Sequence, residues 1–390
     1  MRLAAYLAVF GMCCGAFGDA AGAGTLLEWA ELPELPPPPG ADRQLGLAGP
    51  FVGVDGDALI VAGGANFPEP VWETAKAWHD DVYVLLKNTK TDPPSYRWVP
   101  GAKLDRPVAY GASVSTRRGV LCIGGNDADC VFADVFLLRW NAETETVDRH
   151  PMPSLPAPCT YAGAAAVGDK VYVAGGATGL DLETAEPHFW TIDLADIGAE
   201  GFGWRRLPPW PGPPRAFAVV VAQHNGSDDC VYVISGRRVG ETGETEFLTD
   251  VYEFTPAKCA PDRFDRETGG EDGPWRRRAD APRCVMAGAA IAVGRSHVLV
   301  LGGDDGSMFH QADILKNAHP GFPKEALAYH TVTNTWTSGG PMPANHVTTT
   351  AVRWGIDSVN DPVIIASGEI RPRVRSPKVW RVRPLQACLF

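Results

Sequence analysis

The chain has 390 residues, a formal net charge of −11, and ordinary proportions of hydrophobic (45%) and charged (21%) residues. The negative charge argues against a nucleic-acid partner and against an anionic membrane surface, because both carry the same sign. The 43 glycines and 34 prolines favour an all-β protein with many short strands joined by tight turns.

Residues 1–24 have the features of a secretory signal peptide. Arg2 gives a positive start, residues 3–17 form a short apolar run, and small residues follow at 18–23. The run is too short to span a membrane, so we expect a periplasmic or secreted protein with no membrane insertion after signal cleavage. Cys13 and Cys14 leave a lipoprotein signal as an alternative, although Met12 fits that motif poorly.

Seven cysteines follow the signal, an odd number, so at least one thiol stays unpaired within a monomer. Cys122 and Cys230 lie in or beside apolar strands and are expected to be buried free thiols. The cysteines form no C-x-x-C pair and the histidines do not group at ligand spacing, so no metal site is predicted.

Six apolar strands each end in a pair of small residues and recur about every 50 to 67 residues. The pairs are Gly63-Gly64, Gly124-Gly125, Gly175-Gly176, Ser235-Gly236, Gly302-Gly303 and Ser367-Gly368. Repeats of this length include kelch-type propeller blades. The sequence therefore predicts a single domain at residues 25–390 with the fold of a six-bladed kelch-type β-propeller.

In chain order, a lone strand is expected at residues 25–32, followed by blades that open near residues 46, 106, 161, 215, 283 and 346. The last blade reaches residue 382 before it could form a fourth, outer strand. Most other blades have a tryptophan on the outer strand, namely Trp98, Trp204, Trp275 and Trp336, and the lone strand has Trp29. We therefore predict that the N-terminal strand completes the last blade and closes the ring.

The insertions within the blades differ in length, and the longest lies in blade five. Its residues 308–317 are expected to form a short amphipathic helix over one face of the ring. Insertions of this kind commonly shape the binding sites of propellers.

The residues that follow the six small-residue pairs should lie at equivalent points around one mouth of the central channel. They are Ala65, Asn126, Ala177, Arg237, Asp304 and Glu369, and Asn66 comes directly after the first of them. A ring that includes Asn66, Asn126, Arg237 and Asp304 has the profile of a site for a small polar ligand. The acidic residues Asp127 and Asp305 have a simpler interpretation as turn caps. Glu369 has no such role in a turn and is the first candidate for chemistry.

Three arginines, Arg371, Arg373 and Arg375, alternate after Glu369. On an extended loop they would point the same way and suit a carboxylate ligand, although a solvated cationic edge is an equal alternative for the first two. Tyr110, Tyr161 and Phe217 occupy matching places on the innermost strands. They would either line the channel or pack between blades, and packing is the simpler expectation.

The segments at 46–51, 62–67 and 367–375, together with the glycine-pair blades, resemble the bacterial N-acetylneuraminate epimerase (sialic acid mutarotase) family. The resemblance covers nearly the whole chain after the signal, in a circularly permuted order that a propeller tolerates because its ends are neighbours. It implies interconversion of the α and β anomers of N-acetylneuraminate in the periplasm, with no metal or organic cofactor. The family's catalytic Glu and Arg, six residues apart, match Glu369 and Arg375.

Anomerisation of a ketose requires loss of the anomeric hydroxyl proton and protonation of the ring oxygen, followed by the reverse on the other face. Our hypothesis is that Glu369 relays these protons and Arg375 anchors the carboxylate of the acidic sugar. The alternative is a secreted propeller that binds a glycan or a protein and catalyses nothing, since the fold itself hosts both classes. The oligomeric state is left open by the sequence.

Overall fold

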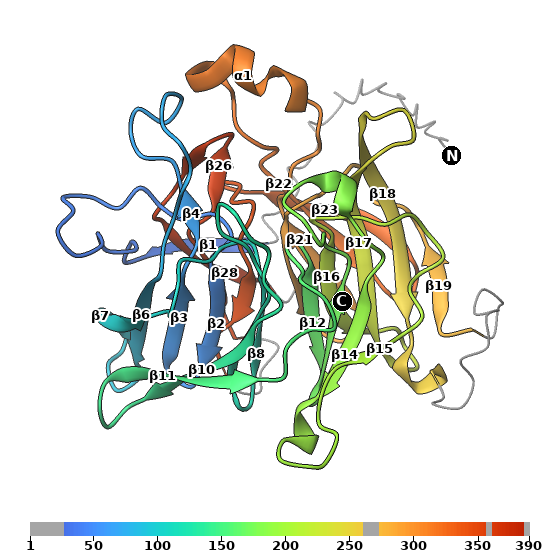
Figure 1. Cartoon of the computed structure of the whole chain (residues 1–390), viewed down its shortest axis with the longest axis horizontal. Coiled ribbons are helices and arrows are strands. Elements are labelled where there is room, and N and C mark those ends of the chain that lie inside the picture. The colour runs from blue at the N-terminus through green and yellow to red at the C-terminus, as the bar shows by residue number, and fades with distance from the viewer. Residues whose placement is uncertain (1–26, 260–272, 356–360, 386–390) are drawn as a thin grey trace, which may run out of the picture.

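The computed structural model describes residues 27–259, 273–355 and 361–385. The predicted signal peptide at 1–24 and Cys13, Cys14 and Cys388 lie outside these ranges. The described chain forms six four-stranded antiparallel sheets arranged as the blades of a propeller (Figure 1). The predicted fold, a six-bladed β-propeller, is confirmed.

Blades one to three take the strands in sequence order from the channel outward. Blade one contains β2 (Phe51–Asp55), β3 (Ala58–Ala62), β6 (Asp81–Asn88) and β7 (Ser95–Lys103). Blade two contains β8 (Ala112–Thr116), β9 (Gly119–Ile123), β10 (Val135–Asn141) and β11 (Thr146–Met152). Blade three contains β12 (Gly163–Val167), β13 (Lys170–Ala174), β14 (Phe189–Asp193) and β15 (Arg205–Arg206).

Blades four and five follow the same order, and blade six takes its outer strand from the start of the chain. Blade four contains β16 (Val219–His224), β17 (Asp229–Val239), β18 (Thr245–Phe254) and β19 (Trp275–Arg278). Blade five contains β20 (Ala289–Val293), β21 (His297–Leu301), β22 (Glu325–His330) and β23 (Thr335–Pro341). Blade six contains β24 (Ala351–Arg353), β25 (Val363–Ala366), β28 (Val379–Pro384) and β1 (Leu27–Leu32).

The ring closes as the tryptophan pattern predicted. β1 pairs antiparallel with β28, with Trp29 opposite Val382, and the Trp29 ring packs edge-on against Trp380 at 6.0 Å between centroids. The innermost strands contact one another in the order β2, β8, β12, β16, β20, β24, and β24 contacts β2 again. Blade six is therefore built from both ends of the described chain.

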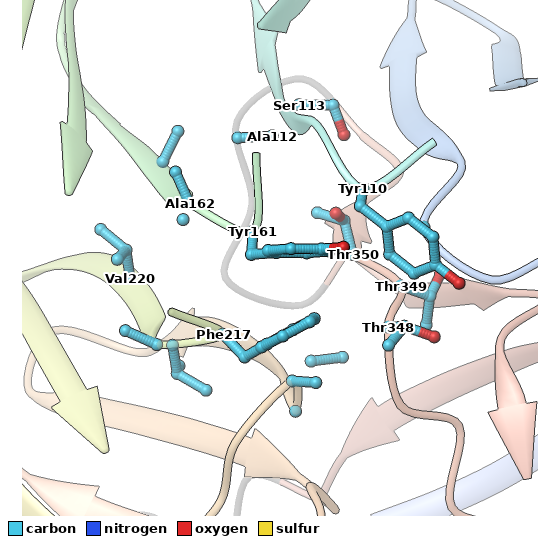
Figure 2. Close-up of a pocket in the computed structure, with 18 of the residues that line it drawn as sticks. Tyr110, Ala112, Ser113, Tyr161, Ala162, Phe217, Val220, Thr348, Thr349 and Thr350 are labelled. Carbon is cyan, nitrogen blue, oxygen red and sulfur yellow. The ribbon is translucent and has the colours of Figure 1, made fainter. Parts of the chain in front are cut away.

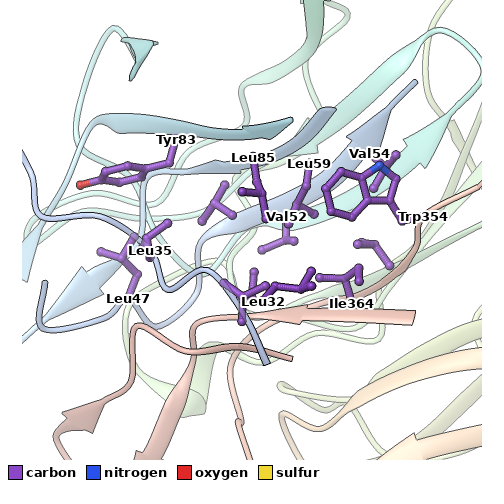
Figure 3. Close-up of a cluster of buried hydrophobic side chains, with 14 residues drawn as sticks. Leu32, Leu35, Leu47, Val52, Val54, Leu59, Tyr83, Leu85, Trp354 and Ile364 are labelled. Atoms are coloured by element: carbon purple, nitrogen blue, oxygen red, sulfur yellow. The ribbon is translucent and has the colours of Figure 1, made fainter. Parts of the chain in front are cut away.

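The blades pack face to face, so their second strands are buried on both sides. β3 and β9 are buried along their whole lengths, which is why they read as continuous apolar runs instead of alternating ones. Figure 3 shows the core between blades six and one, where Leu32, Val52 and Leu59 meet Trp354 and Ile364. Since this core joins the first and last blades, it reinforces the closure made by β1.

The small-residue pairs are required because the next blade's backbone passes close to them. A Cβ on Gly63 would lie 2.4 Å from Val108 O, and one on Gly124 would lie 2.2 Å from Cys159 O. In blades four and six a serine at positive φ takes this place. Ser235 Oγ accepts from Val285 N at 2.8 Å, and Ser367 Oγ accepts from Leu47 N at 2.7 Å. The serine hydroxyls thus bond the connection to the next blade.

A closed ring of six backbone hydrogen bonds surrounds the channel just before the innermost strands. Its members all have positive φ, and each donates its N–H to the carbonyl of the member in the preceding blade, at 2.6 to 2.9 Å. They are Gly49, Tyr110, Tyr161, Phe217, Ala287 and Thr348, and Gly49 completes the ring by donating to Thr348 O. We call these residues the channel ring.

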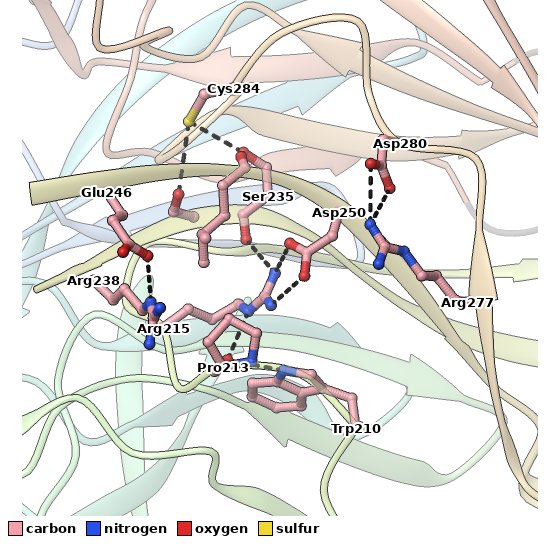
Figure 4. A network of polar contacts seen from close by, with 12 residues as sticks. Trp210, Pro213, Arg215, Ser235, Arg238, Glu246, Asp250, Arg277, Asp280 and Cys284 are labelled. Carbon is pink, nitrogen blue, oxygen red and sulfur yellow. Dashed lines mark hydrogen bonds and ion pairs between the residues drawn. The ribbon is translucent and has the colours of Figure 1, made fainter. Parts of the chain in front are cut away.

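A buried polar network fixes the strand ends of blade four (Figure 4). The fully buried Arg215 grips Asp250 with two hydrogen bonds, at 2.6 and 2.8 Å, and its Nη1 also donates to Ser235 O at 3.1 Å. Burial acts to raise the pKa of Asp250, but the hydrogen bonds and charge of Arg215 outweigh it and lower that pKa. Arg215 thereby fixes the register shift within β17 at Ser235, two residues before Arg237.

The outer-strand tryptophans link neighbouring blades. The indole N–H groups of Trp98, Trp204, Trp275 and Trp336 donate to the carbonyls of Pro33, Pro153, Pro208 and Ala279 at 2.8 to 3.0 Å. Trp204 precedes its outer strand by one residue. Trp29 Nε1 is buried without a partner among the described residues, so the strand that closes the ring lacks this link.

The insertion of blade five is helical, but it is not the amphipathic helix that the sequence predicted. It contains a 3-10 turn η4 (Phe309–Gln311), a single α-turn α1 (Ala312–Leu315) and a 3-10 turn η5 (Lys316–Ala318). Ile314 is 79% exposed, so one turn of helix does not bury an apolar face. Three further 3-10 turns are η1 (Leu182–Thr184), η2 (Leu194–Asp196) and η3 (Pro256–Lys258).

Two two-stranded ribbons, β4 (Ala65–Asn66) with β5 (Ala77–Trp78) and β26 (Glu369–Arg371) with β27 (Val374–Arg375), lie at the same end of the ring as α1 (Figure 1). Within the described ranges no helix is long and apolar enough to cross a membrane. Cys122 and Cys230 are buried free thiols, as expected.

Candidate active site

Glu369 and Arg375 face each other across the β26–β27 hairpin, where they are directly paired residues. Pro372 and Arg373 form the turn, and Arg373 has φ of +66°, which matches a type II turn with proline at its first central position. Glu369 Oε1 accepts from Arg373 N at 2.7 Å and from Arg375 Nη1 at 3.2 Å. The six-residue spacing therefore produces an ion pair because the loop folds back on itself.

The Arg375 side chain is only 3% exposed. Its Nη2 lies 3.5 Å from the Tyr110 hydroxyl, and its guanidinium lies 4.9 Å from the centre of the Phe67 ring. Burial disfavours the cation, but Glu369 and Tyr110 outweigh that effect and raise the pKa of Arg375. Since Arg375 Nε is buried with no partner among the described residues, this cation keeps one unused donor.

The three arginines do not form the one-sided fork that their alternation predicted. The turn at Arg373 breaks the alternation, so the side chains diverge. Arg371 bonds Asn317 of the blade-five insertion and does not line the cavity. Arg373 stacks on Phe67 at 4.0 Å and donates to Thr74 O at 2.7 Å. Of the three side chains, that of Arg375 is the one that bonds Glu369.

The expected ring of strand-end residues is present. Each member pairs, in an antiparallel bridge, with the residue before a channel-ring residue, as in Glu369 with Val347 and Asp304 with Met286. Blades one to three contribute Ala65, Asn126 and Ala177, which are buried, whereas blades four to six contribute the charged Arg237, Asp304 and Glu369. One half of the mouth is therefore charged.

The channel ring has the matching asymmetry. Blades two to four contribute Tyr110, Tyr161 and Phe217, whereas blades five, six and one contribute Ala287, Thr348 and Gly49. Figure 2 shows the aromatic side chains projecting into the central space, with Tyr161 stacked on Phe217 at 4.4 Å between centroids. Both interpretations hold, because these rings line the cavity and also pack on one another across neighbouring blades.

A cavity of about 570 Å³ occupies this mouth. Its floor includes the aromatic residues together with Ala287 and Thr348, and its walls carry Arg237, Asp304, Glu369, Arg373 and Arg375. The blade-five insertion borders it through Met308, Phe309 and His310. A smaller cavity of about 120 Å³ continues below the channel ring, between the innermost strands (Figure 2).

Arg237 lies between two aromatic rings, with its guanidinium 4.7 Å from the centre of Phe217 and 5.1 Å from that of Phe309. Burial lowers the pKa of Arg237 despite the nearby Asp304 and Glu369. Its Nε is buried and has no partner in the described part of the chain. Arg237 is therefore a desolvated cation on the cavity wall, where its guanidinium is positioned by two aromatic rings.

Asp304 is held by its own turn, with Oδ1 accepting from Gly306 N at 3.0 Å. Burial raises the pKa of its carboxyl. The negative charges of Asp305 and Glu369 act in the same direction, whereas the Gly306 N–H and Arg237 oppose them. The neighbouring Asp127 and Asp305 cap turns as expected, by accepting from Cys130 N and Ser307 N.

Two predicted ligand-binding residues do not line the cavity. Asn66 is buried. Its Nδ2 donates to Gly46 O at 3.1 Å, and its Oδ1 bonds His79 Nε2 at 3.0 Å. Asn126 is also buried, donates to the Tyr161 hydroxyl at 3.1 Å and accepts from Trp78 Nε1 at 3.3 Å. Both amides are therefore occupied by protein contacts, and Asn126 supports the aromatic wall.

Sequence reasoning missed Lys76, whose amino group lines the cavity 4.9 Å from the centre of the Tyr110 ring. It also missed Phe67, which lies under both Arg373 and Arg375. Phe67 falls within a segment that carried the family resemblance, so a signal was present. Lys76 lies in an irregular insertion, where the sequence contains no repeat pattern to place it.

A family model described as N-acetylneuraminate epimerase matches residues 19–147. Relatives with that name include proteins of Brucella melitensis (35% identical over 132 residues), Yersinia enterocolitica (35% over 133) and Salmonella typhi (36% over 113). These matches cover 31%, 30% and 26% of this chain and 32%, 31% and 27% of the respective relatives.

The matched region includes Phe67 and Tyr110 but ends well before Glu369 and Arg375. The circular permutation implied by the resemblance therefore stays a prediction. Blade one and most of blade two are thus similar in sequence to about a third of an N-acetylneuraminate epimerase.

Proposed function

We propose that this protein accelerates the interconversion of the α and β anomers of N-acetylneuraminate. The observation that carries the proposal is the ion pair between the buried Arg375 and the partly buried Glu369 on the wall of the 570 Å³ cavity. A base beside a desolvated cation is what anomerisation of an acidic sugar requires. The similarity of residues 19–147 to N-acetylneuraminate epimerases supports the same reaction and substrate.

In this proposal the substrate carboxylate is bound by the cations of the cavity. Arg375 and Arg237 both line the cavity, so their guanidinium groups can contact an anion bound there. Arg373 and Lys76 add positive charge to the wall. The apolar face of the sugar would lie against Tyr161 and Phe217.

Glu369 acts as the proton relay. Its Oε1 is held by Arg373 N and Arg375 Nη1, so the carboxylate is oriented before the substrate arrives. It removes the proton of the anomeric hydroxyl and delivers it to the ring oxygen as the ring opens, and after closure on the other face it moves a proton from that oxygen to the new anomeric oxygen. The proposal includes no metal or organic cofactor.

The proposal places this activity in the periplasm or outside the cell, and it assigns the blades to the kelch type. The support for export is the composition of residues 1–24. The support for kelch repeats is the glycine-pair strand endings together with the outer-strand tryptophans.

Proton NMR of freshly released α-N-acetylneuraminate tests the reaction directly. We expect the wild-type protein to speed anomer equilibration above the spontaneous rate, and Glu369→Gln to lose that excess, by about 100-fold or more. Glu325→Gln, which changes an exposed glutamate on β22, is the matched control and should retain full activity. A folded wild-type protein that binds the sugar without speeding equilibration would instead identify a binding propeller.

A further inference from the structure

We propose that Asp304 is the second proton-transfer residue, acting on the sugar ring oxygen while Glu369 acts on the anomeric hydroxyl. This inference rests on the proposed anomerisation and extends it from one carboxyl group to two. It starts from the placement of the two residues. Asp304 and Glu369 occupy equivalent strand-end positions in adjacent blades, five and six, and both line the same cavity.

The floor between them is open. The channel-ring residues of these two blades are Ala287 and Thr348, and Thr348 N donates to Ala287 O at 2.8 Å. In blades two to four the equivalent floor positions are filled by aromatic rings. A sugar ring therefore has room above Ala287 and Thr348. There it would lie close to the carboxyl groups of both Asp304, from blade five, and Glu369, from blade six.

The surroundings give the two carboxyl groups different tasks. Glu369 Oε1 accepts from a guanidinium and a backbone N–H, and both contacts stabilise negative charge on that oxygen. Asp304 is fixed through Oδ1 by Gly306 N, whereas no described residue bonds its Oδ2. Burial raises the pKa of Asp304, as expected for a group that carries a proton to be donated. Glu369 is thus suited to be the base and Asp304 the acid.

The proton transfers balance without a co-reactant. Glu369 takes the anomeric hydroxyl proton, the bond from the anomeric carbon to the ring oxygen breaks, and its electron pair goes to that oxygen, which takes the proton of Asp304. The anomeric carbon becomes a ketone carbon and can rotate. On closure from the other face, the former ring hydroxyl returns its proton to Asp304, and protonated Glu369 gives its proton to the new anomeric oxygen.

The test is the pH profile of the excess equilibration rate. Because Asp304 must donate its proton, the wild-type rate falls at high pH as Asp304 is deprotonated. We expect Asp304→Asn to lower the maximal rate by about 100-fold and to abolish the alkaline limb, with little change in sugar affinity. Loss of that limb is a readout that a purely structural role would not produce.

Asp305→Asn is the matched control, because Asp305 is the next residue, is partly exposed and caps a turn. It should keep the wild-type maximal rate. An Asp304→Asn variant with the wild-type rate and an unchanged alkaline limb would overturn the inference while leaving Glu369 as the sole relay. A wild-type protein with no excess rate would overturn the proposed function as well, so the two failures are distinguishable.

Carbon-13 NMR of the Asp304 carboxyl gives a second result that needs no substrate. The signal, assigned by its absence in Asp304→Asn, should titrate above the ordinary aspartate value of about 3.9. In Glu369→Gln it should titrate at lower pH, because one negative neighbour is removed. Titration of Asp304 at or below the ordinary value would contradict a proton-donating role.

Discussion

At the scale of single residues, the three arginines of the cavity wall differ in the contacts that they make. Arg375 is paired with Glu369, and Arg373 donates to Thr74 O. Arg237 is stacked between Phe217 and Phe309, and in the described chain its Nε has no partner. Arg237 forms no ion pair with any residue that the structure describes, so its contribution to binding can be measured without a large loss of stability.

We expect Arg237→Met to raise KM by about tenfold to a hundredfold, because this factor corresponds to the free energy of one charge-assisted hydrogen bond. The urea concentration at the midpoint of unfolding should change little. The long apolar side chain of methionine keeps contact with the two aromatic rings. Arg238→Met is the control, because Arg238 pairs with Glu246 and does not line the cavity. Equal KM values for wild type and Arg237→Met would remove Arg237 from the binding site.

At the scale of elements, the β26–β27 hairpin determines the geometry of the site, and its turn depends on Arg373 at positive φ. This conformation costs a non-glycine residue about 1 kcal/mol. It directs Arg373 N at Glu369 Oε1, so the backbone of the turn holds the base in place.

Two substitutions of Arg373 separate the backbone role from that of the side chain. Arg373→Gly removes the Cβ but keeps the N–H and the positive φ, and we expect wild-type kcat with a higher KM. Arg373→Pro removes the N–H and excludes positive φ, so kcat should fall while the propeller stays folded. Steady-state anomer equilibration by NMR gives both constants. Similar kcat values for the two variants would show that the turn does not orient Glu369.

The sequence predicted the elements better than it predicted the directions of side chains. Blade strands, strand-end glycines and the Glu369–Arg375 spacing are local patterns, and each was found where the pattern placed it. The fork of arginines did not form, and the Asn66 amide bonds Gly46 and His79, because these features depend on a turn conformation and on partners that no repeat specifies. Lys76 was missed for the same reason.

At the scale of the whole molecule, the ring is closed by β1 and by the core between blades six and one. Leu27 on β1 is 2% exposed and packs in the cluster that includes Trp380 and Val382, whereas the adjacent Glu28 faces solvent. Substitutions of these two residues therefore distinguish the stability contributed by a buried side chain of β1 from that contributed by the pairing of the strand.

Leu27→Ala should lower the free energy of unfolding by about 2 to 5 kcal/mol, the usual cost of a cavity at a buried leucine. Glu28→Ala should change it by no more than about 0.5 kcal/mol. Urea denaturation followed by tryptophan fluorescence measures both. If Leu27→Ala were as stable as wild type, β1 would contribute little to closure.

The channel ring also continues across the place where the first and last blades meet. On the outside, the polypeptide has a clear join, where β1 meets β28. At the centre there is none, because the bond from Gly49 N to Thr348 O continues a circuit in which every amide points the same way around the axis. The innermost hydrogen-bond ring is therefore continuous across the boundary between blades six and one. Its six amides should exchange with solvent deuterium as one cooperative group, and moving the chain ends to another blade should leave that exchange unchanged.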